Sequence, residues 1–143
     1  MVNNEKLNET YLGFIQSIIS RMAQNSFQAK AWGITIVSAL LAFYLGKDAI
    51  EIRDIIICIS CVVVLLFCIL DTYYLYLERG YRYLYNVVVG VEKSNKKIIE
   101  YDLRIPEQYR GIKNGIKALF SFSTGLFYSI IGFFLLILKV VLK

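Results

Sequence analysis

The sequence predicts an all-α integral membrane protein, and three observations lead to this fold class. Hydrophobic residues make up 57% of the chain, above the roughly 45–50% of an average soluble domain. These residues gather into three long runs instead of recurring at the spacing of a water-soluble core. Lysines and arginines stand mainly at the ends of the runs and between the second and the third. We therefore expect one membrane domain with an amphipathic N-terminal helix, a transmembrane hairpin, a cytoplasmic helical extension and a third apolar span.

Residues 7–25 are expected to form the amphipathic helix, which lies in the membrane interface or packs on a partner helix. Apolar side chains recur there in steps of three and four, and polar side chains take the other face. Asn25 and Ser26 are expected to interrupt this helix and to cap the next one. The apolar positions are Leu7, Tyr11, Phe14, Ile15, Ile18, Ile19 and Met22.

Two apolar runs predict the hairpin, with spans over residues 27–46 and 55–75. Residues 31–46 carry no charge. As a helix they extend about 24 Å, somewhat less than a hydrocarbon core of about 30 Å. Extension back to Phe27 supplies the remainder, with Lys30 reaching toward the surface. Residues 55–70 are also without charge, and the charged stretch 47–54 forms the connecting loop.

The second span is expected to cross the headgroup layer through a belt of tyrosines and arginines and to continue as a helix to about residue 89. Tyrosine rings concentrate at that depth because one end of the ring is apolar and the other polar. Gly90 then marks the end of the helix. A ligand-binding platform is the alternative interpretation of these rings. The belt consists of Tyr73, Tyr74, Tyr76, Arg79 and Arg82.

Residues 91–117 are predicted to form a basic cytoplasmic segment, and residues 118–138 a third span. Pro106, the only proline, suits the first turn of a short helix through about Lys113. The third run is long enough to cross a membrane. A membrane-lying or re-entrant segment is the alternative.

The distribution of positive charge predicts the orientation. With the N-terminus inside, twelve lysines and arginines fall on the cytoplasmic side and four on the other, and cytoplasmic loops carry such an excess. This bias predicts a membrane protein whose N-terminus is cytoplasmic. Because the cations are mostly juxtamembrane, the net charge of +5 requires no nucleic-acid partner. The four outer cations are Lys47, Arg53, Lys139 and Lys143.

The residue types exclude several kinds of site. The chain has no histidine, which rules out Ser-His-Asp and Cys-His arrangements. Cys58 and Cys61 form a C-x-x-C pair, but they lie inside an apolar run without a second pair, so we interpret them as helix-packing residues. Phosphate-binding glycine loops and paired catalytic carboxylates do not occur in the sequence. We expect no enzyme activity, no catalytic residues, no metal and no cofactor.

Asp71 is the ionisable residue that the hydropathy pattern places inside the bilayer, about one turn from the cytoplasmic face. An acid at that depth is costly and implies a partner or a water-filled path. The candidate partners are Thr72, Arg79 of a neighbouring chain and Lys30; the alternative is a carboxylate that simply reaches into the interface. Asp71 and Thr72 are therefore the candidates for a pore lining or a gate, where a ring of carboxylates would favour cations.

Small residues line one face of each span, which lets helix backbones approach closely. Such faces in three spans favour association between copies of the chain, and packing within one subunit is the alternative. Cys58, Cys61, Cys68 and Thr72 form the stripe of the second span. The first and third spans carry Ala31, Thr35, Ser38, Ala42 and Gly46, and Ser121, Gly125, Ser129 and Gly132.

Two stretches carry a resemblance to a known group of proteins. The chain has RMAQNSFQAKAW entering the first span, and the second span ends in DTYYLYLER. These stretches resemble small, mostly uncharacterised bacterial membrane proteins over roughly the first 86 residues. More loosely, the layout is similar to the multi-span effector modules of prokaryotic antiphage systems, including the SLATT class. That resemblance implies oligomers that perforate or depolarise the inner membrane when a sensor detects phage.

The leading hypothesis is an oligomeric inner-membrane effector or pore-like component that alters membrane permeability, with antiphage defence as its setting. The alternative is a non-conducting anchor or adaptor that recruits a cytosolic sensor or enzyme through its basic face. A small transporter subunit that uses Asp71 for cation coupling is a third class. The expected partners are the lipid bilayer, further copies of the chain and a cytosolic protein. The partner face consists of Lys96, Lys97, Arg110 and Lys113.

Overall fold

The computed structural model describes residues 2–46, 50–93 and 101–141, and this part of the chain is helical without any strand. Its elements are α1 (Val2–Leu45), α2 (Ile50–Val89), α3 (Ile112–Leu119), the π-helical turn η1 (Phe122–Leu126) and α4 (Phe127–Val141). Three stretches are long and apolar enough to cross a membrane: Glu9–Leu45, Glu51–Val89 and Phe122–Val141. The predicted all-helical fold with three apolar helices is confirmed.

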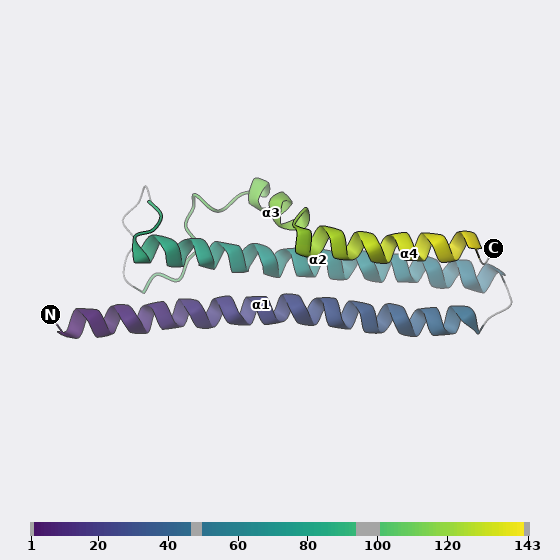
Figure 1. The fold of residues 1–143 in the computed structure, drawn as a ribbon, viewed down its shortest axis with the longest axis horizontal. Helices are drawn as coiled ribbons and strands as arrows, with labels where there is room; N and C mark the ends of the chain where they lie inside the picture. The colour runs from purple at the N-terminus through teal and green to yellow at the C-terminus, as the bar shows by residue number, and fades with distance from the viewer. Residues whose placement is uncertain (1, 47–49, 94–100, 142–143) are drawn as a thin grey trace.

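α1 and α2 form a long antiparallel hairpin (Figure 1). With 44 and 40 residues, they extend about 66 and 60 Å, twice the thickness of a hydrocarbon core. The hairpin therefore has two halves. We call residues 31–45 of α1, residues 51–70 of α2 and α4 the apolar bundle, and residues 9–30 of α1 with residues 71–89 of α2 the stalk.

α1 runs without a break through Asn25 and Ser26, so the predicted interruption at these two residues is wrong. Their polarity would favour a helix end if they faced water. Instead the Ser26 side chain is buried, and its hydroxyl donates to Asp71 of α2 rather than capping the backbone of its own chain segment. A tertiary partner thus replaces the local one, and the backbone remains helical.

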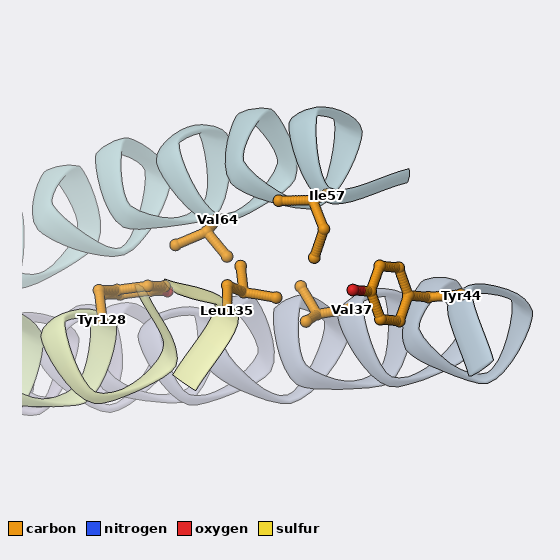
Figure 2. Packing of buried hydrophobic residues seen from close by; sticks show 6 residues of the cluster. All are labelled: Val37, Tyr44, Ile57, Val64, Tyr128 and Leu135. Carbon is orange, nitrogen blue, oxygen red and sulfur yellow. The ribbon is translucent and has the colours of Figure 1, made fainter. Parts of the chain in front are cut away.

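The apolar bundle holds one core shared by α1, α2 and α4. Figure 2 shows its buried side chains, which point into the space between the three helices. Gly33 permits a close approach of α1 to α2, because a Cβ atom there would lie 3.3 Å from the Phe67 ring. The Tyr44 hydroxyl donates to the carbonyl of Leu138, which satisfies an acceptor at the end of α4. The core consists of Val37, Tyr44, Ile57, Val64, Tyr128 and Leu135.

The stalk has a second, smaller core of Tyr11, Ile15 and Leu84. Ile15 and Leu84 are 0% and 1% exposed, so the N-terminal apolar face is covered by α2 of the same chain. Of the two alternatives for residues 7–25, the described part of this segment packs on a helix. Gly90, with a φ of 85°, follows the last residue of α2 in the conformation that ends helices.

The third apolar run is divided by a break. The predicted short helix from Pro106 to Lys113 is wrong: Pro106 starts a turn closed by the Tyr109 amide, and α3 begins only at Ile112, after Gly111. Ser121 is extended, with φ −68° and ψ 147°, so helical structure stops there and resumes at η1. The apolar helix thus begins at Phe122 instead of residue 118. A hydrogen bond from Arg79 to the Ser121 hydroxyl stabilises this break.

Candidate functional site: a buried ion pair between α1 and α2

Lys30 and Asp71 form an ion pair inside the hairpin, at the boundary between the apolar bundle and the stalk. The Lys30 ammonium lies 2.6 Å from Asp71 Oδ2, and the Asp71 side chain is 0% exposed. The Oδ2 contact is a close ion pair rather than an aligned hydrogen bond. Asp71 Oδ1 accepts a hydrogen bond of 2.5 Å from the Ser26 hydroxyl, and Ser26 Oγ accepts one of 3.2 Å from Lys30. The three side chains make one closed polar cluster.

Helical spacing explains how the cluster forms. Ser26 and Lys30 are four residues apart on α1, so both face Asp71 on α2. Buried Ala29 lies beside them. α4 adds the Phe127 ring, whose centroid lies 5.9 Å from the Lys30 ammonium, a distance suited to a cation–π contact. All three long helices therefore meet at this point.

The depth of the cluster follows from the uncharged length of α2. Asp71 follows Asp54 by seventeen positions, which corresponds to about 25 Å of helix. At the opposite end, Asp54 lies 3.4 Å from Lys139. A hydrocarbon core is about 30 Å thick. If the apolar bundle spans a bilayer, the Lys30–Asp71 pair lies at the very edge of the hydrocarbon.

The energetics of the pair argue against a purely structural role. Removing one member of a buried ion pair costs about 3–5 kcal/mol because the other charge is left without a partner. Replacing both members by apolar side chains is often neutral or stabilising. A chain that needed only helix packing at this position would be served as well by leucine or methionine. Net stability therefore does not distinguish this pair from an apolar contact at the same place.

Thr72 is not part of the cluster, because its hydroxyl donates to the Cys68 carbonyl on α2 itself. The Asp71 carboxylate points into the α1–α2 interface instead of an open surface, so it does not line an open path in this structure. A ring of carboxylates from several copies of the chain stays a prediction. Of the partners considered for Asp71, the structure brings Lys30 to it. The alternative of an unpartnered carboxylate is wrong.

The tyrosine and arginine belt has two kinds of member. Tyr73 is 55% exposed, and Tyr74 packs beside it with ring centroids 5.8 Å apart. Tyr76 instead contacts Tyr109, with ring centroids 5.7 Å apart. Arg82 pairs with Glu78 one turn earlier. The platform formed by Tyr76 is thus covered by another part of the same chain.

Residues 101–110, which we call the strap, lie across the stalk. The Tyr11 hydroxyl donates to the Asp102 carbonyl at 2.6 Å, and the side chain of Ile105 fits against Gly80. Tyr83 donates to Gln108 at 2.7 Å. These contacts join α1, α2 and the strap.

At one end of the strap, the Arg104 side chain and amide hydrogen-bond to the Asp102 carboxylate and lower its pKa below the usual value. The carboxylate therefore stays ionised to lower pH than a free aspartate, and this contact is lost only in acid.

Arg79 connects the stalk to the start of the third apolar helix. Its guanidinium donates to the Lys117 carbonyl at 3.1 Å and to the Ser121 hydroxyl at 2.6 Å. These two bonds hold the end of α3 and the break at Ser121 against α2. Arg79 is therefore engaged within its own chain in this structure.

The predicted partner face is only partly described. Arg110 donates from its Nε to the Ile105 carbonyl, but its side chain is exposed overall, and Lys113 is also exposed. Lys96 and Lys97 lie outside the described residues. Arg110 and Lys113 are three positions apart in the sequence, and the structure leaves both side chains exposed.

The small-residue faces differ in what covers them. The face on α1, which continues to Gly46 just after the helix, is wholly exposed, and α1 packs on α2 through a different side that includes Gly33 and Val37. On α4, Ser129 is exposed and a Cβ added at Gly132 would meet nothing within 4 Å, whereas in η1 a Cβ added at Gly125 would lie 3.4 Å from the Leu119 carbonyl oxygen. Packing within the subunit therefore does not explain the face on α1. Its exposed members are Ala31, Thr35, Ser38, Ala42 and Gly46.

Two buried polar residues, Ser26 of the cluster and Thr124 of η1, are not revealed by the hydropathy pattern. Ser26 precedes Lys30 by one helical turn in the sequence. This spacing predicts a shared contact only when Asp71 is known to face both residues. Thr124 is fully buried in η1, and its hydroxyl has no hydrogen-bond partner among the described residues. Its position depends on the π-helical turn, for which we find no sequence signal.

Known proteins give no further guide to this site. Comparison with models of protein families, with curated proteins and with solved structures finds no match for the chain. Among the described residues, no group of three or more Cys, Asp or Glu side chains is placed to hold a metal ion. The fold and the site together define an all-helical protein with three potential membrane spans and a buried interhelical ion pair.

Proposed function

We propose that the protein is a membrane-embedded, oligomeric effector of the pore or channel type, and that this structure represents its closed state. The apolar bundle crosses the inner membrane, and the stalk extends into the cytoplasm on the side richer in lysine and arginine. Its cellular setting, on the strength of the loose resemblance in layout, is defence against phage.

The observation that carries this proposal is the buried Lys30–Asp71 pair. It stands where the stalk meets the apolar bundle, and it holds α1 against α2 at the hydrocarbon edge. Breaking the pair frees one carboxylate and one ammonium at the cytoplasmic end of the spans, which supplies polar groups for a water-filled path. The exposed small residues of α1, such as Thr35 and Ser38, supply a surface on which copies of the chain associate.

The test is ion flux from liposomes that contain the purified protein, with the oligomer size measured in the same preparation. Asp71→Asn removes the charge that holds Lys30, so we expect flux to rise above that of the wild type. Asp54→Asn is the matched control, because it removes a carboxylate from the same helix at an exposed pair, and we expect it to behave as the wild type. The exchange Lys30→Asp with Asp71→Lys restores an ion pair and should restore the closed state.

Each outcome bears on the proposal. A rise in flux for Asp71→Asn alone, from a discrete oligomer, supports a gated pore. If wild type and all variants are monomers without flux, the pore proposal is wrong. The anchor or adaptor function then takes its place, because the exposed Arg110 and Lys113 next to the strap offer a basic surface to a cytosolic protein.

A further inference from the structure

α3 carries a row of large apolar side chains that no described part of the chain covers. Ile112 and Ile116 are one turn apart and 84% and 50% exposed, and Phe120 continues the row at 78%. Phe122, just beyond the break, is 83% exposed. The opposite side of α3 packs on α2, with Ala118 fully buried. An uncovered row of this size indicates a surface that meets lipid or another protein.

The rest of α3 is positively charged. Lys113 and Lys117 are exposed, and neither forms an ion pair with any residue in the described ranges. Arg110 adds an exposed cation just before the helix. No aspartate or glutamate follows Glu107 in the sequence, so the positive charge of this stretch is not balanced locally. An anionic partner would therefore match the positive charge of this surface.

The start of the third apolar helix gives the depth of α3. α3 ends at Leu119, three residues before the apolar helix that begins at Phe122. Arg79 holds this junction against α2 through the Lys117 carbonyl and the Ser121 hydroxyl. Headgroup layers extend a bilayer from about 30 Å to about 40–45 Å. With the apolar bundle in the hydrocarbon, the C-terminal end of α3 comes to lie in the headgroup layer, next to the start of the span at Phe122 (Figure 1).

We propose that α3 is an interfacial helix that binds anionic phospholipids. Ile112, Ile116 and Phe120 insert among the upper acyl chains, and Lys113 and Lys117 contact the lipid phosphates. This assignment rests on the membrane embedding proposed above and adds a lipid class to it. Anionic headgroups are preferred over zwitterionic ones because the local cations lack acidic partners.

The first measurement is depth in the bilayer. The full chain, with its three native cysteines replaced by alanine and Ile112→Cys labelled with an environment-sensitive fluorophore, is reconstituted in vesicles that contain brominated lipid. We expect the label to be quenched by the brominated lipid and shielded from aqueous iodide. Trp32, the only tryptophan and 62% exposed on the apolar bundle, reports embedding independently in the same vesicles.

The second measurement is lipid selectivity. Detergent-solubilised wild-type protein is titrated with short-chain phosphatidylglycerol and with short-chain phosphatidylcholine. Each lysine at an anionic surface contributes a factor of about five, so Lys113→Gln with Lys117→Gln should lower the preference for phosphatidylglycerol about 25-fold. The control Arg21→Gln with Lys93→Gln removes two exposed cations elsewhere in the chain and should leave the preference unchanged.

The results separate this inference from the proposal on which it rests. If brominated lipid quenches Trp32 but not the label at position 112, the protein is embedded and the interfacial role of α3 is wrong. If neither is quenched, both are wrong. An equal loss of selectivity in the control pair, or crosslinking of position 112 to a second copy of the chain, also overturns lipid binding by α3. Quenching at both positions with selectivity lost only in the α3 variant supports it.

Discussion

Among single residues, Tyr109 shows how the strap is fixed by rings of α2. Its centroid lies 5.7 Å from that of Tyr76 and 5.7 Å from that of Tyr83, so the Tyr109 ring contacts both. Burial raises the pKa of the Tyr109 hydroxyl above its usual value, and nearby Arg79 partly opposes this rise. The neutral phenol is therefore favoured when the strap is docked.

This shift predicts that the strap detaches in alkali. A tyrosine whose pKa is raised in the docked state stabilises docking fully below its free pKa of 10.0, and that contribution is lost as the pH rises past 10 through the docked pKa. Limited proteolysis of residues 101–110 at rising pH should show faster cleavage in that range. In Tyr109→Phe, which keeps the ring contacts and cannot ionise, the increase should be smaller. Equal increases in both proteins would contradict a role for Tyr109 ionisation.

At the scale of elements, the strap depends on the close approach of Ile105 to α2. Gly80 makes this possible, since a Cβ atom there would lie 2.8 Å from Ile105 Cδ1 and 3.0 Å from Cγ2. Two branches of the isoleucine face the glycine, so a rotation that relieves one contact does not relieve the other. Ile105 is 8% exposed, and its burial couples the strap to the middle of the stalk.

We therefore expect Gly80→Ala to release the strap while α2 itself remains helical. Overpacking of this kind costs about 1–3 kcal/mol. Hydrogen exchange of the strap amides should accelerate, and helix content by circular dichroism should not fall. Gly13→Ala is the matched control in the other helix of the stalk, where an added Cβ meets nothing within 4 Å. It should stabilise α1 by about 0.5–1 kcal/mol, with no change in strap exchange.

If Gly80→Ala leaves strap exchange unchanged, Ile105 has room to move and the strap is held by its hydrogen bonds alone. Tyr11→Phe would then be the variant that releases it, because the Tyr11 hydroxyl bonds to the strap backbone.

At the scale of the whole molecule, α1 and α2 each run continuously through two parts of different composition, the apolar bundle and the stalk. The apolar bundle is a three-helix unit with aliphatic and aromatic residues on its outer surface, and the stalk is a two-helix unit with the strap across it. Lys30 and Asp71 are at their boundary. In the proposed function, a rotation or bending of the stalk would reach the spans through this boundary, where the ion pair lies.

Much of this organisation could be predicted from hydropathy and charge. The three apolar stretches, the end of α2 before Gly90 and the need of Asp71 for a partner all follow from local patterns. The partner of Asp71 could not be chosen from the sequence, because Lys30 is placed opposite it only by the register of two helices. The uninterrupted α1 and the turn at Pro106 escaped prediction for a related reason. Ser26 and Tyr109 find partners far along the chain, and these contacts outweigh local capping preferences.

The length of the stalk has a consequence for how a cytosolic signal reaches the spans. From Asp71 to Val89 the stalk rises about 27 Å, whereas the Debye length in physiological salt is about 8 Å. In the proposed embedding, Asp71 lies at the hydrocarbon edge and the headgroup layer surrounds about the first 5–8 Å of the stalk. The tip of the stalk is then about 20 Å from the charge of the lipid surface, which is more than two screening lengths, and about 27 Å from the ion pair. We therefore expect a protein bound at the tip to influence the ion pair through a displacement of the two helices, so that the stalk would act as a mechanical lever rather than an electrostatic sensor.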